Sequence, residues 1–529
     1  MKRLMSLAVF LLLAATPLLA QTSPVSLASL IESGNRKAAL DRIRTGANVN
    51  EAQPDGTRPI HWAVQRVDYE LLAALIAKKA NLNVRNEFGS TPIAQAAEIA
   101  DARMVKMLLD AGAEPEGANP DGQTALMLAI KTGETAVVDM LIKAGANVNT
   151  VERFHKQTPL MWAATAPRNA GELVKLLLAK GADVKPRALY TDWPSQITSE
   201  PRAQYRPVGG LTALLYAARD GCYDCVAALI SAGADVNAPT PEGVTALMLA
   251  LDNDHNDVAK LLLDRGASPH LWDWWGRTAL YIVIDRKETL PAGGRGGANA
   301  RAVPALRSAV SSMDIINALL AADVDVNPQL NFHRPSRGGN SGRFVDPLLN
   351  TGCTPLLRAT MGGDVEVVRA LLAKGADPNI NAMGLTSFLV AAGVGAGNRG
   401  GTGLAAERSA GGPVNIELME MLLQRGADVN AQVTGTLTYT MRVSRAPSAN
   451  EGRTALHIAA QSGRADIVRY LLSKGANTEI TDVGGQKAID LVGSGEKTAP
   501  APAVGAKPAP PAASPAEIRS VLENAGSRR

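Results

Sequence analysis

The residues of this chain whose spacing could do chemistry are a pair of cysteines. Cys222 and Cys225 stand three apart in GCYDCV, and Cys353 is the third cysteine of the 529 residues. A C-x-x-C pair can be the centre of a thiol oxidoreductase, which needs an exposed thiolate of lowered pKa. It can also supply half of a zinc site, which takes about four ligands, or form a local disulfide. Even with His255 recruited, the zinc ligand set is incomplete.

A glycine pattern also resembles a cofactor motif. Gly395-x-Gly397-x-x-Gly400 matches the dinucleotide-binding fingerprint in letters. That fingerprint requires a strand before it, whereas these glycines follow an expected helix and lie in a glycine-rich insertion. The sequence has no H-E-x-x-H, no G-x-S-x-G and no phosphate-binding loop. We therefore expect a protein that is not an enzyme, with no catalytic residues, no cofactor and no bound metal.

The elements that must position these residues repeat along the chain. Segments such as TALMLAI, TPLMWAA and TALHIAA match one template, and GANVN, GADVN or GADPN follows at a set distance. Steps of 33 residues separate Thr91 from Thr124 and Thr212 from Thr245. With a degenerate first unit at Val25, twelve units extend to about residue 526.

Each unit predicts two helices and a turn. A threonine such as Thr91, followed by proline, is typical of a helix N-cap and first helical position. A glycine such as Gly221 ends this first helix, and an apolar-periodic stretch such as VVDMLIKAG predicts a second. Gly145 lies where a left-handed residue should close that helix, and the following Asn, Asp and Gly favour a hairpin turn. One pair is too small to bury its apolar face, so neighbouring units must stack.

These repeats resemble ankyrin repeats over nearly all of the chain after its first residues. The resemblance rests on the 33-residue step, the TPL or TAL segments and the closing GADVN. The motif's usual histidine remains only as His61 and His457, Asp323 replaces a closing glycine, and Lys487 replaces a threonine. The resemblance implies an all-α ankyrin-repeat solenoid with short β-hairpin fingers and several long loop insertions. It also implies a scaffold that binds proteins through hairpin tips and inner helices.

The breaks in the period give the expected domain boundaries. A signal peptide occupies 1–20, and the other segments are, in order, units one to five at 25–185, an insertion at 186–210, units six to eight at 211–327 with an insertion at about 288–312, an insertion at 328–350, units nine and ten at 351–430 with an insertion at about 395–412, an insertion at 431–450, and units eleven and twelve at 451–529 with a Pro/Ala-rich insertion at about 493–514.

The insertions outside the Pro/Ala run are basic. Each carries a net positive charge, whereas the rest of the chain after the signal peptide is net negative. This pattern favours contact with an acidic partner protein, although solenoids also tolerate polar surface insertions without any function. An alternative function is adhesion of these loops to an anionic polymer of the cell envelope. The arginines that we expect to contact a partner are Arg334, Arg337, Arg343, Arg442 and Arg445.

Three tryptophans mark one hairpin tip. Trp272, Trp274 and Trp275 cluster in SPHLWDWWGRT, and the repeat register places them at or near the turn. Exposed tryptophans are costly and often dominate binding at protein interfaces, so they are candidate partner-binding residues. The alternative is that neighbouring insertions cover them.

The N-terminus predicts export. Lys2 and Arg3 precede an unbroken apolar run, and Ala20 offers a cleavage point before Gln21. We expect a protein of the periplasm or the exterior that starts at Gln21. No later segment has the roughly 20 apolar residues of a membrane span. A formal net charge of +4 gives no indication of nucleic-acid binding, and we expect a monomer.

The repeat register also changes the interpretation of GCYDCV. Gly221 is the break after a first helix, Cys222 takes the place of His255 one unit later, and Cys225 is an inward position of a second helix. Two cysteines three apart at a helix start can form a disulfide in an oxidising compartment. The sequence leaves a disulfide and two free thiols both open, and a redox or metal-dependent enzyme rests on these cysteines alone.

Overall fold

A computed structural model describes most of the chain. The described residues are 25–191, 208–289, 309–330, 352–382, 384–395, 414–434, 439–440, 443–444, 450–494 and 514–526. The chain divides into two compact parts, Met1–Asn147 and Val148–Arg529, which are described separately. The predicted signal peptide at 1–20 lies outside the described residues, as do the five candidate arginines Arg334, Arg337, Arg343, Arg442 and Arg445.

The described helices form twelve pairs, four in the N-terminal part and eight in the C-terminal part. The first elements of the pairs are α1 (Leu27–Glu32), α3 (Pro59–Gln65), α5 (Pro92–Glu98), α7 (Ala125–Thr132), α9 (Pro159–Ala164), α11 (Ala213–Asp220), α13 (Ala246–Asp252), α15 (Ala279–Thr289), α17 (Pro355–Gly362), α19 (Ser387–Ala391), α22 (Ala455–Gln461) and the 3-10 turn η2 (Ala488–Leu491). The second elements are α2 (Arg36–Arg44), α4 (Tyr69–Ala77), α6 (Ala102–Asp110), α8 (Thr135–Lys143), α10 (Ala170–Ala179), α12 (Tyr223–Ser231), α14 (Asn256–Asp264), α16 (Ser312–Ala321), α18 (Val365–Ala373), α21 (Ile416–Gln424), α23 (Ala465–Ser473) and α24 (Pro515–Gly526).

The first helices begin where the sequence predicts. The Thr124 hydroxyl accepts the Met127 N–H at 3.3 Å and so caps α7. Pro59 and Pro92 occupy the first turn of α3 and α5, where a missing N–H has no cost. Unit twelve differs, because Lys487 replaces the threonine. Its first element is the short 3-10 turn η2, against which α24 packs.

The second helices bury one face and end in a closing turn. In α6, Met104, Val105 and Leu108 are fully buried, and their spacing of one, three and four places them on one face. Gly112 follows α6 with φ +91°. At the same place in unit eight Asp323 adopts φ +56°, a conformation that costs a residue with a Cβ about 1 kcal/mol. The structure thus keeps the turn even where the glycine is lost.

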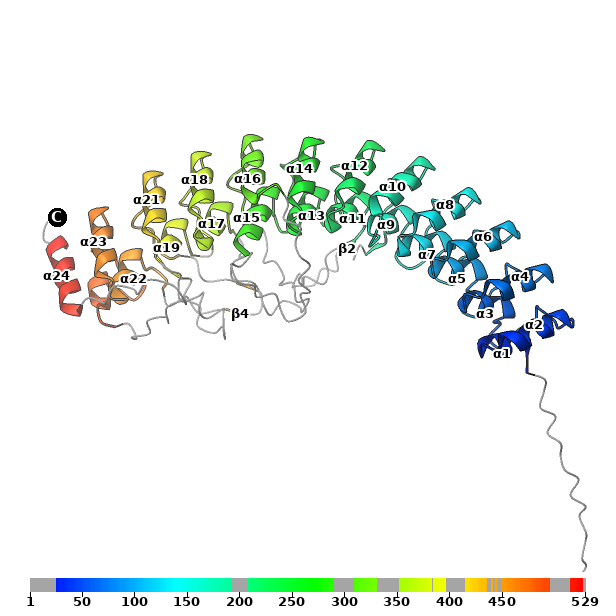
Figure 1. Ribbon diagram of the computed structural model, residues 1–529. Coiled ribbons are helices and arrows are strands. Elements are labelled where there is room, and N and C mark those ends of the chain that lie inside the picture. Colours follow the sequence, from blue (N-terminus) through cyan, green and yellow to red (C-terminus); the bar gives the residue numbers. More distant parts are fainter. Residues whose placement is uncertain are drawn as a thin grey trace, which may run out of the picture. The chain divides into compact units, whose positions relative to one another are not determined.

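Neighbouring units stack helix on helix within each part. First helices pack on first helices, as α11 does on α13, and second helices pack on second helices, as α12 does on α14. Within each part the two kinds of helix form two rows (Figure 1). The apolar layer between the rows is the core. Because each unit completes its core only against its neighbours, the stack distributes stability along the array.

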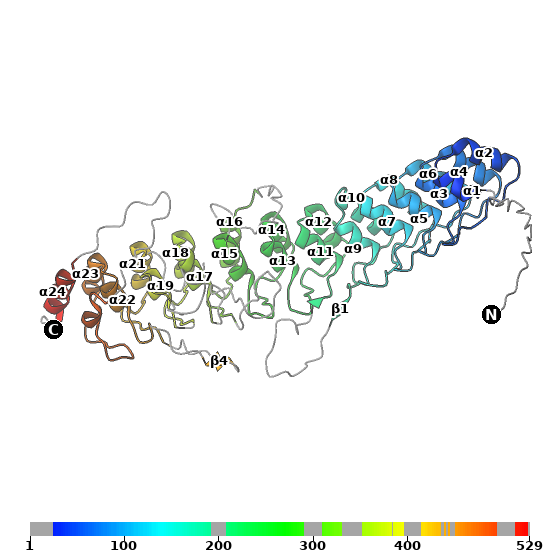
Figure 2. The same ribbon diagram turned by 90° about the horizontal axis from the view of Figure 1, so that it is seen from below.

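We call the segment between a second helix and the next first helix a finger. Within each part the fingers project from one side of the helix rows (Figure 2), and isolated bridges such as Ala118 with Thr124 close them. The enlarged fingers keep the same base, since Leu330 N–H donates to Cys353 O at 3.2 Å and Gly352 N–H to Leu330 O at 2.7 Å. Two of them contain a short pair of antiparallel strands: β1 (Tyr190–Thr191) with β2 (Val208–Gly209), and β3 (Tyr439–Thr440) with β4 (Val443–Ser444).

Ion pairs, one buried and one partly exposed, join units seven to nine of the C-terminal part. Arg358 of α17 donates to Asp285 of α15 at 2.7 Å, and both side chains are less than a tenth exposed. Arg286 of α15 pairs with Asp254, at 2.9 Å between Nε and Oδ1, and this bond holds the pKa of Arg286 above its ordinary value. These contacts cross from one unit to the next and fix which helix faces which.

Among the described residues, no helix combines the length and the apolar character that a bilayer span requires.

Candidate protein-binding surface

The finger before α15 presents two of its three tryptophans to solvent. The exposed fraction is 66% for Trp272 and 48% for Trp274, but 7% for Trp275. The ring of Trp275 lies beside Arg277, whose guanidinium carbon is 5.4 Å from the ring centroid. The side chain of Trp275 faces inward, toward the buried Arg277. Trp272 and Trp274 are therefore exposed and Trp275 is covered, and the binding of a partner by these tryptophans stays a prediction.

A buried charge cluster holds this finger in place. Arg277 donates to the Asp273 carboxylate at 2.7 Å and pairs with Asp252 of α13 at 3.1 Å. Burial opposes the charge of Arg277, but Asp252 and Asp273 more than offset it, so the pKa of Arg277 lies above its ordinary value. Asp273 also accepts the N–H groups of Trp275 and Arg277, at 3.0 and 2.9 Å. The turn that carries the tryptophans is thus fixed before any partner arrives.

The same finger is seated closely on the preceding one. Trp274 N–H donates to Glu242 O at 2.8 Å. A Cβ at Gly243 would lie 3.1 Å from the Trp272 carbonyl oxygen, and Gly243 has φ +82°. Glycine is therefore required on both counts. Rigid support of this kind lowers the entropic cost of binding through Trp272 and Trp274.

A pocket of about 250 Å³ lies beside Trp272. It is bounded on one side by the tryptophan finger and on the other by the segment that closes unit eight. Its lining residues are Pro269, His270, Trp272, Gly276 and Thr278 from the first, with Val324, Asp325, Pro328 and Gln329 from the second. The pocket therefore combines apolar walls with several polar groups.

Asparagines at the ends of the GADVN-type segments connect successive units, a role that sequence analysis missed. Asn237 donates to Gly266 O at 3.2 Å and accepts the Ser268 N–H at 2.7 Å. Asn379 does the same with Gly426 O and Asp428 N–H, both at 2.9 Å. We call each such bridge a rung. The repeated Asn in the template was the signal, but its partners lie in the next unit.

The rung is missing beside the pocket. His270 stands where the template has Asn, and no hydrogen bond within the described segments joins it to Asp323 or Asp325 of the next closing turn. Lys185 likewise stands in place of the asparagine at the step to the closing turn of α12. Glu116 replaces the asparagine at a third step, but its carboxylate still accepts the Asn147 N–H. Of the two steps at Lys185 and His270, the described pocket adjoins His270.

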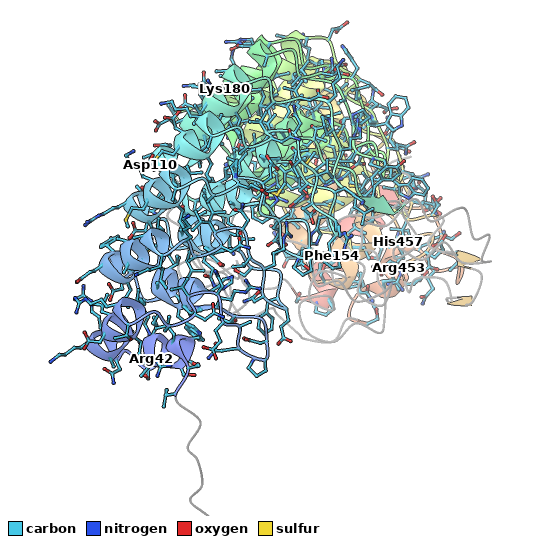
Figure 3. All side chains as sticks on the ribbon, turned by 90° about the vertical axis from the view of Figure 1, so that its right-hand side faces the viewer. Arg42, Asp110, Phe154, Lys180, Arg453 and His457 are labelled. Atoms are coloured by element: carbon cyan, nitrogen blue, oxygen red, sulfur yellow. A yellow bond between two sulfur atoms is a disulfide. The ribbon has the colours of Figure 1, made fainter. Side chains whose placement is uncertain are left out.

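Other fingers also carry exposed apolar side chains. Phe88 is 66% exposed in the N-terminal part, and Phe154 and Val483 are 62% and 72% exposed in the C-terminal part. Figure 3 labels Phe154 and also Lys180, the C-cap residue that follows α10. Such single residues are normal on a protein surface. The tryptophan finger differs because two large rings and a pocket occur together.

The cysteines occupy structural positions. A disulfide joins Cys222 and Cys225 in the structure. Cys222 is the N-cap of α12, where its sulfur accepts the Cys225 N–H at 3.3 Å. The third cysteine, Cys353, is buried, and burial raises the pKa of its thiol to about 11. A thiol with that pKa is protonated near neutral pH and is a poor nucleophile.

Within the described segments, no group of three or more His, Cys, Asp or Glu side chains is placed so that it could hold a metal ion.

Comparison with known proteins identifies the repeats. The family model described as ankyrin repeats in three copies matches residues 27–119, 93–188 and 196–273, and the single ankyrin repeat model matches 351–382 and 451–483. Together these matches cover more than half of the chain. The chain belongs to the ankyrin repeat family. This confirms the resemblance and the all-α repeat solenoid expected from the sequence.

Individual relatives match this chain over part of their length. The mitochondrial disaggregase of Homo sapiens is 34% identical over 179 residues, which are 33% of this chain and 23% of the relative. The L-asparaginase of Dirofilaria immitis is 33% identical over 125 residues, 22% of this chain and 21% of the relative. This chain therefore spans less than a quarter of the length of these two curated relatives.

One solved structure is similar to part of this chain. The crystal structure of the ankyrin repeat domain of Bcl-3, of the IkappaB protein family, is 24% identical to this chain with a TM-score of 0.35. The match covers 43% of this chain and 94% of that one. Ankyrin repeats, the family shown by the matching models, generally mediate protein–protein interaction.

Proposed function

We propose that this chain is an exported, non-catalytic scaffold that binds a partner protein through its tryptophan finger. The observation that carries the proposal is the pairing of exposed Trp272 and Trp274 on a turn fixed by the buried Asp273–Arg277 pair. Large aromatic rings on a preorganised support are typical of interface hot spots. The basic insertions favour an acidic surface on the partner.

Export is part of the proposal. The charged and apolar N-terminus with Ala20 before Gln21 supports it. The disulfide between Cys222 and Cys225 supports it as well, because such bonds persist in oxidising compartments. N-terminal sequencing of the protein purified from periplasm and from culture medium tests export. A start at Gln21 is expected, whereas recovery of the chain only from the cytoplasm, starting at Met1, would contradict it.

Affinity capture from envelope and medium extracts tests the binding surface. The wild-type protein is compared with W272A/W274A, and F88A serves as the control because Phe88 is as exposed as Trp272. We expect the tryptophan variant to recover at least about tenfold less of the main partner, since removing two hot-spot rings costs roughly 2 kcal/mol or more. F88A should recover the wild-type amount. Equal recovery by all three proteins would refute the tryptophan finger as the binding site.

Salt separates this function from adhesion to an anionic polymer. Aromatic burial survives high salt, whereas attraction between exposed charges is screened. Partner capture that persists at high salt and depends on Trp272 and Trp274 supports the protein interface. Binding that disappears at high salt and is indifferent to the two tryptophans would favour the polymer.

A further inference from the structure

At His270 the backbone groups that a rung asparagine would contact lack that partner, whereas at several other steps the array supplies the asparagine itself. At other steps an asparagine amide donates to the carbonyl of the closing turn and accepts the N–H two residues later. Asn149 does this with Gly181 O at 3.0 Å and Asp183 N–H at 2.8 Å. Asn327 does it with Gly375 O at 3.4 Å and Asp377 N–H at 2.9 Å. The corresponding groups of unit eight are the Asp323 carbonyl and the Asp325 N–H.

The pocket lies at this interrupted step. His270 is exposed and lines the pocket together with Val324 and Asp325 of the next unit. The space is about 250 Å³, which is enough for one side chain and part of a backbone but below the usual size of a site for a drug-sized ligand. Trp272, 66% exposed, stands at the same pocket. A side chain that entered here would therefore lie against an aromatic ring.

We propose that this pocket binds the carboxamide of an asparagine or glutamine carried by an extended segment of the partner protein. The inference rests on the proposed function and specifies what the tryptophan finger recognises. The inserted amide would donate to the Asp323 carbonyl and accept the Asp325 N–H, as the chain's own asparagines do at neighbouring steps. Trp272 would cover the backbone of the bound segment.

The polar groups of the pocket select for this side chain. A carboxamide carries a donor and an acceptor together, whereas an ammonium group has no acceptor. A carboxylate has no donor when ionised, and the exposed Asp325 side chain would repel it. Asp and Lys should therefore be poor substitutes for Asn in the bound segment.

The variant His270→Asn tests the proposal by restoring the rung. The new side chain should bridge to Asp323 and Asp325, raise the melting temperature and fill the pocket. Lys185→Asn is the matched control, because it restores the other missing rung away from the pocket. The probe is a labelled peptide with the sequence of residues 233–240, GADVNAPT, which contains a rung asparagine. The comparison peptide has Asp in place of that Asn, and the binding of each peptide is followed by fluorescence anisotropy.

We expect the wild-type protein and K185N to bind the Asn peptide at least about fivefold more tightly than the Asp peptide, the ratio expected from about one net hydrogen bond. H270N and W272A should each bind the Asn peptide at least about fivefold more weakly than the wild type. Circular dichroism confirms that each variant is folded. Equal binding by H270N and the wild type, equal binding of the two peptides, or no binding to the wild type would each overturn the proposal.

Failure of this inference can be told from failure of the proposed function. If H270N captures the partner as well as the wild type does while W272A/W274A does not, the pocket is not used and the tryptophan finger still binds. If the tryptophan variant also captures the partner fully, the proposed function itself fails.

Discussion

Residues 58–147 and residues 245–382 build the same repeat in different ways. In the first stretch every unit has the regular length, and the side chains of an ion pair such as Lys106 with Asp110, at 2.9 Å, are both about two-thirds exposed. In the second stretch two insertions interrupt the period, and Arg277 and Arg358 form ion pairs with side chains 5% and 2% exposed. The regular stretch depends on apolar stacking, and the interrupted one adds buried charge.

This difference shows where specificity is needed. A regular array fixes its register through helix length and the repeated apolar face, because each unit offers one way to stack. An insertion lengthens the chain between two elements and permits other arrangements. Burying Asp285 against Arg358 costs desolvation, but a mispaired neighbour would leave that charge uncompensated. We therefore interpret the buried pairs as devices that fix the order of units seven to nine.

The largest expected effect is the removal of one member of a buried pair. Asp285→Ala takes away the carboxylate 2.7 Å from the Arg358 guanidinium and should lower the free energy of unfolding by about 3 kcal/mol or more. The control is Lys106→Ala, which breaks the pair of Lys106 with Asp110 in the regular stretch, where both side chains are about two-thirds exposed. That change should cost less than about 1 kcal/mol. If urea denaturation gives equal losses of unfolding free energy for the two variants, the buried pair does not stabilise its stretch more than an exposed pair does.

The disulfide lies between the two stretches in sequence and should have the next largest effect. Closing so short a loop stabilises by at most about 2 kcal/mol in the chain-entropy model. The variant C222S/C225A keeps an N-cap hydroxyl for α12 and loses the bond, so its unfolding free energy should fall by roughly 1–2 kcal/mol. Thiol titration of the denatured, unreduced wild type should find one reactive group, Cys353. Three reactive thiols would show that the bond is absent.

Removing a rung should lower the free energy of unfolding by less than removing one member of a buried ion pair. Asn327→Ala removes the hydrogen bonds to Gly375 O and Asp377 N–H and should cost about 1–2 kcal/mol. Asn83→Ala in the regular stretch removes its bond from Glu114 N–H, of 2.9 Å, and should cost about 1 kcal/mol or less. Thermal unfolding of both variants gives the comparison. A larger loss for N83A than for N327A would show that the interrupted stretch does not depend more on its rungs.

The smallest expected effect is a dependence of the unfolding free energy on pH, which arises from His61 in the regular stretch. Burial lowers the pKa of His61, whose ring accepts Arg58 N–H at 3.1 Å and faces Ser90 O at 3.2 Å. The unfolded chain therefore binds a proton more readily than the folded one. Stability from this group is present above the unfolded pKa of about 6.5 and is lost as the pH falls through the lower folded pKa.

The corresponding positions of the interrupted stretch hold Met248, Tyr281 and Leu357, which do not titrate in this range. His457, in a later unit, shares the arrangement of His61, and its pKa is also lowered by burial. H61Q/H457Q should thus lose less stability than the wild type between about pH 7.5 and pH 5. His155→Gln is the control, because that side chain is 77% exposed. The urea midpoint is measured as a function of pH. If H155Q reduces its pH dependence as much as H61Q/H457Q does, the buried histidines are not the cause of that dependence.

Much of the fold could be predicted because each unit carries its own local signals. The Thr124 cap and the residues at the closing turns act within one or two helical turns, so a single sequence shows them. The candidate site was harder to predict. Trp274 and Trp275 are neighbours of the same type, yet one ring is half exposed and the other is buried against Arg277. Which one faces inward depends on Asp252, in the unit before.

The sequence by itself determined the period, the starts and ends of the helices and the family, because those features follow from contacts between residues close in the chain. The tertiary structure alone decided the burial of Trp275, the pairing of Asp285 with Arg358 and the pocket at His270. These features arise between units, where residues tens of positions apart meet. The replacement of Asn by His270 can be interpreted only from the structure, because the groups that an asparagine would contact belong to the next unit.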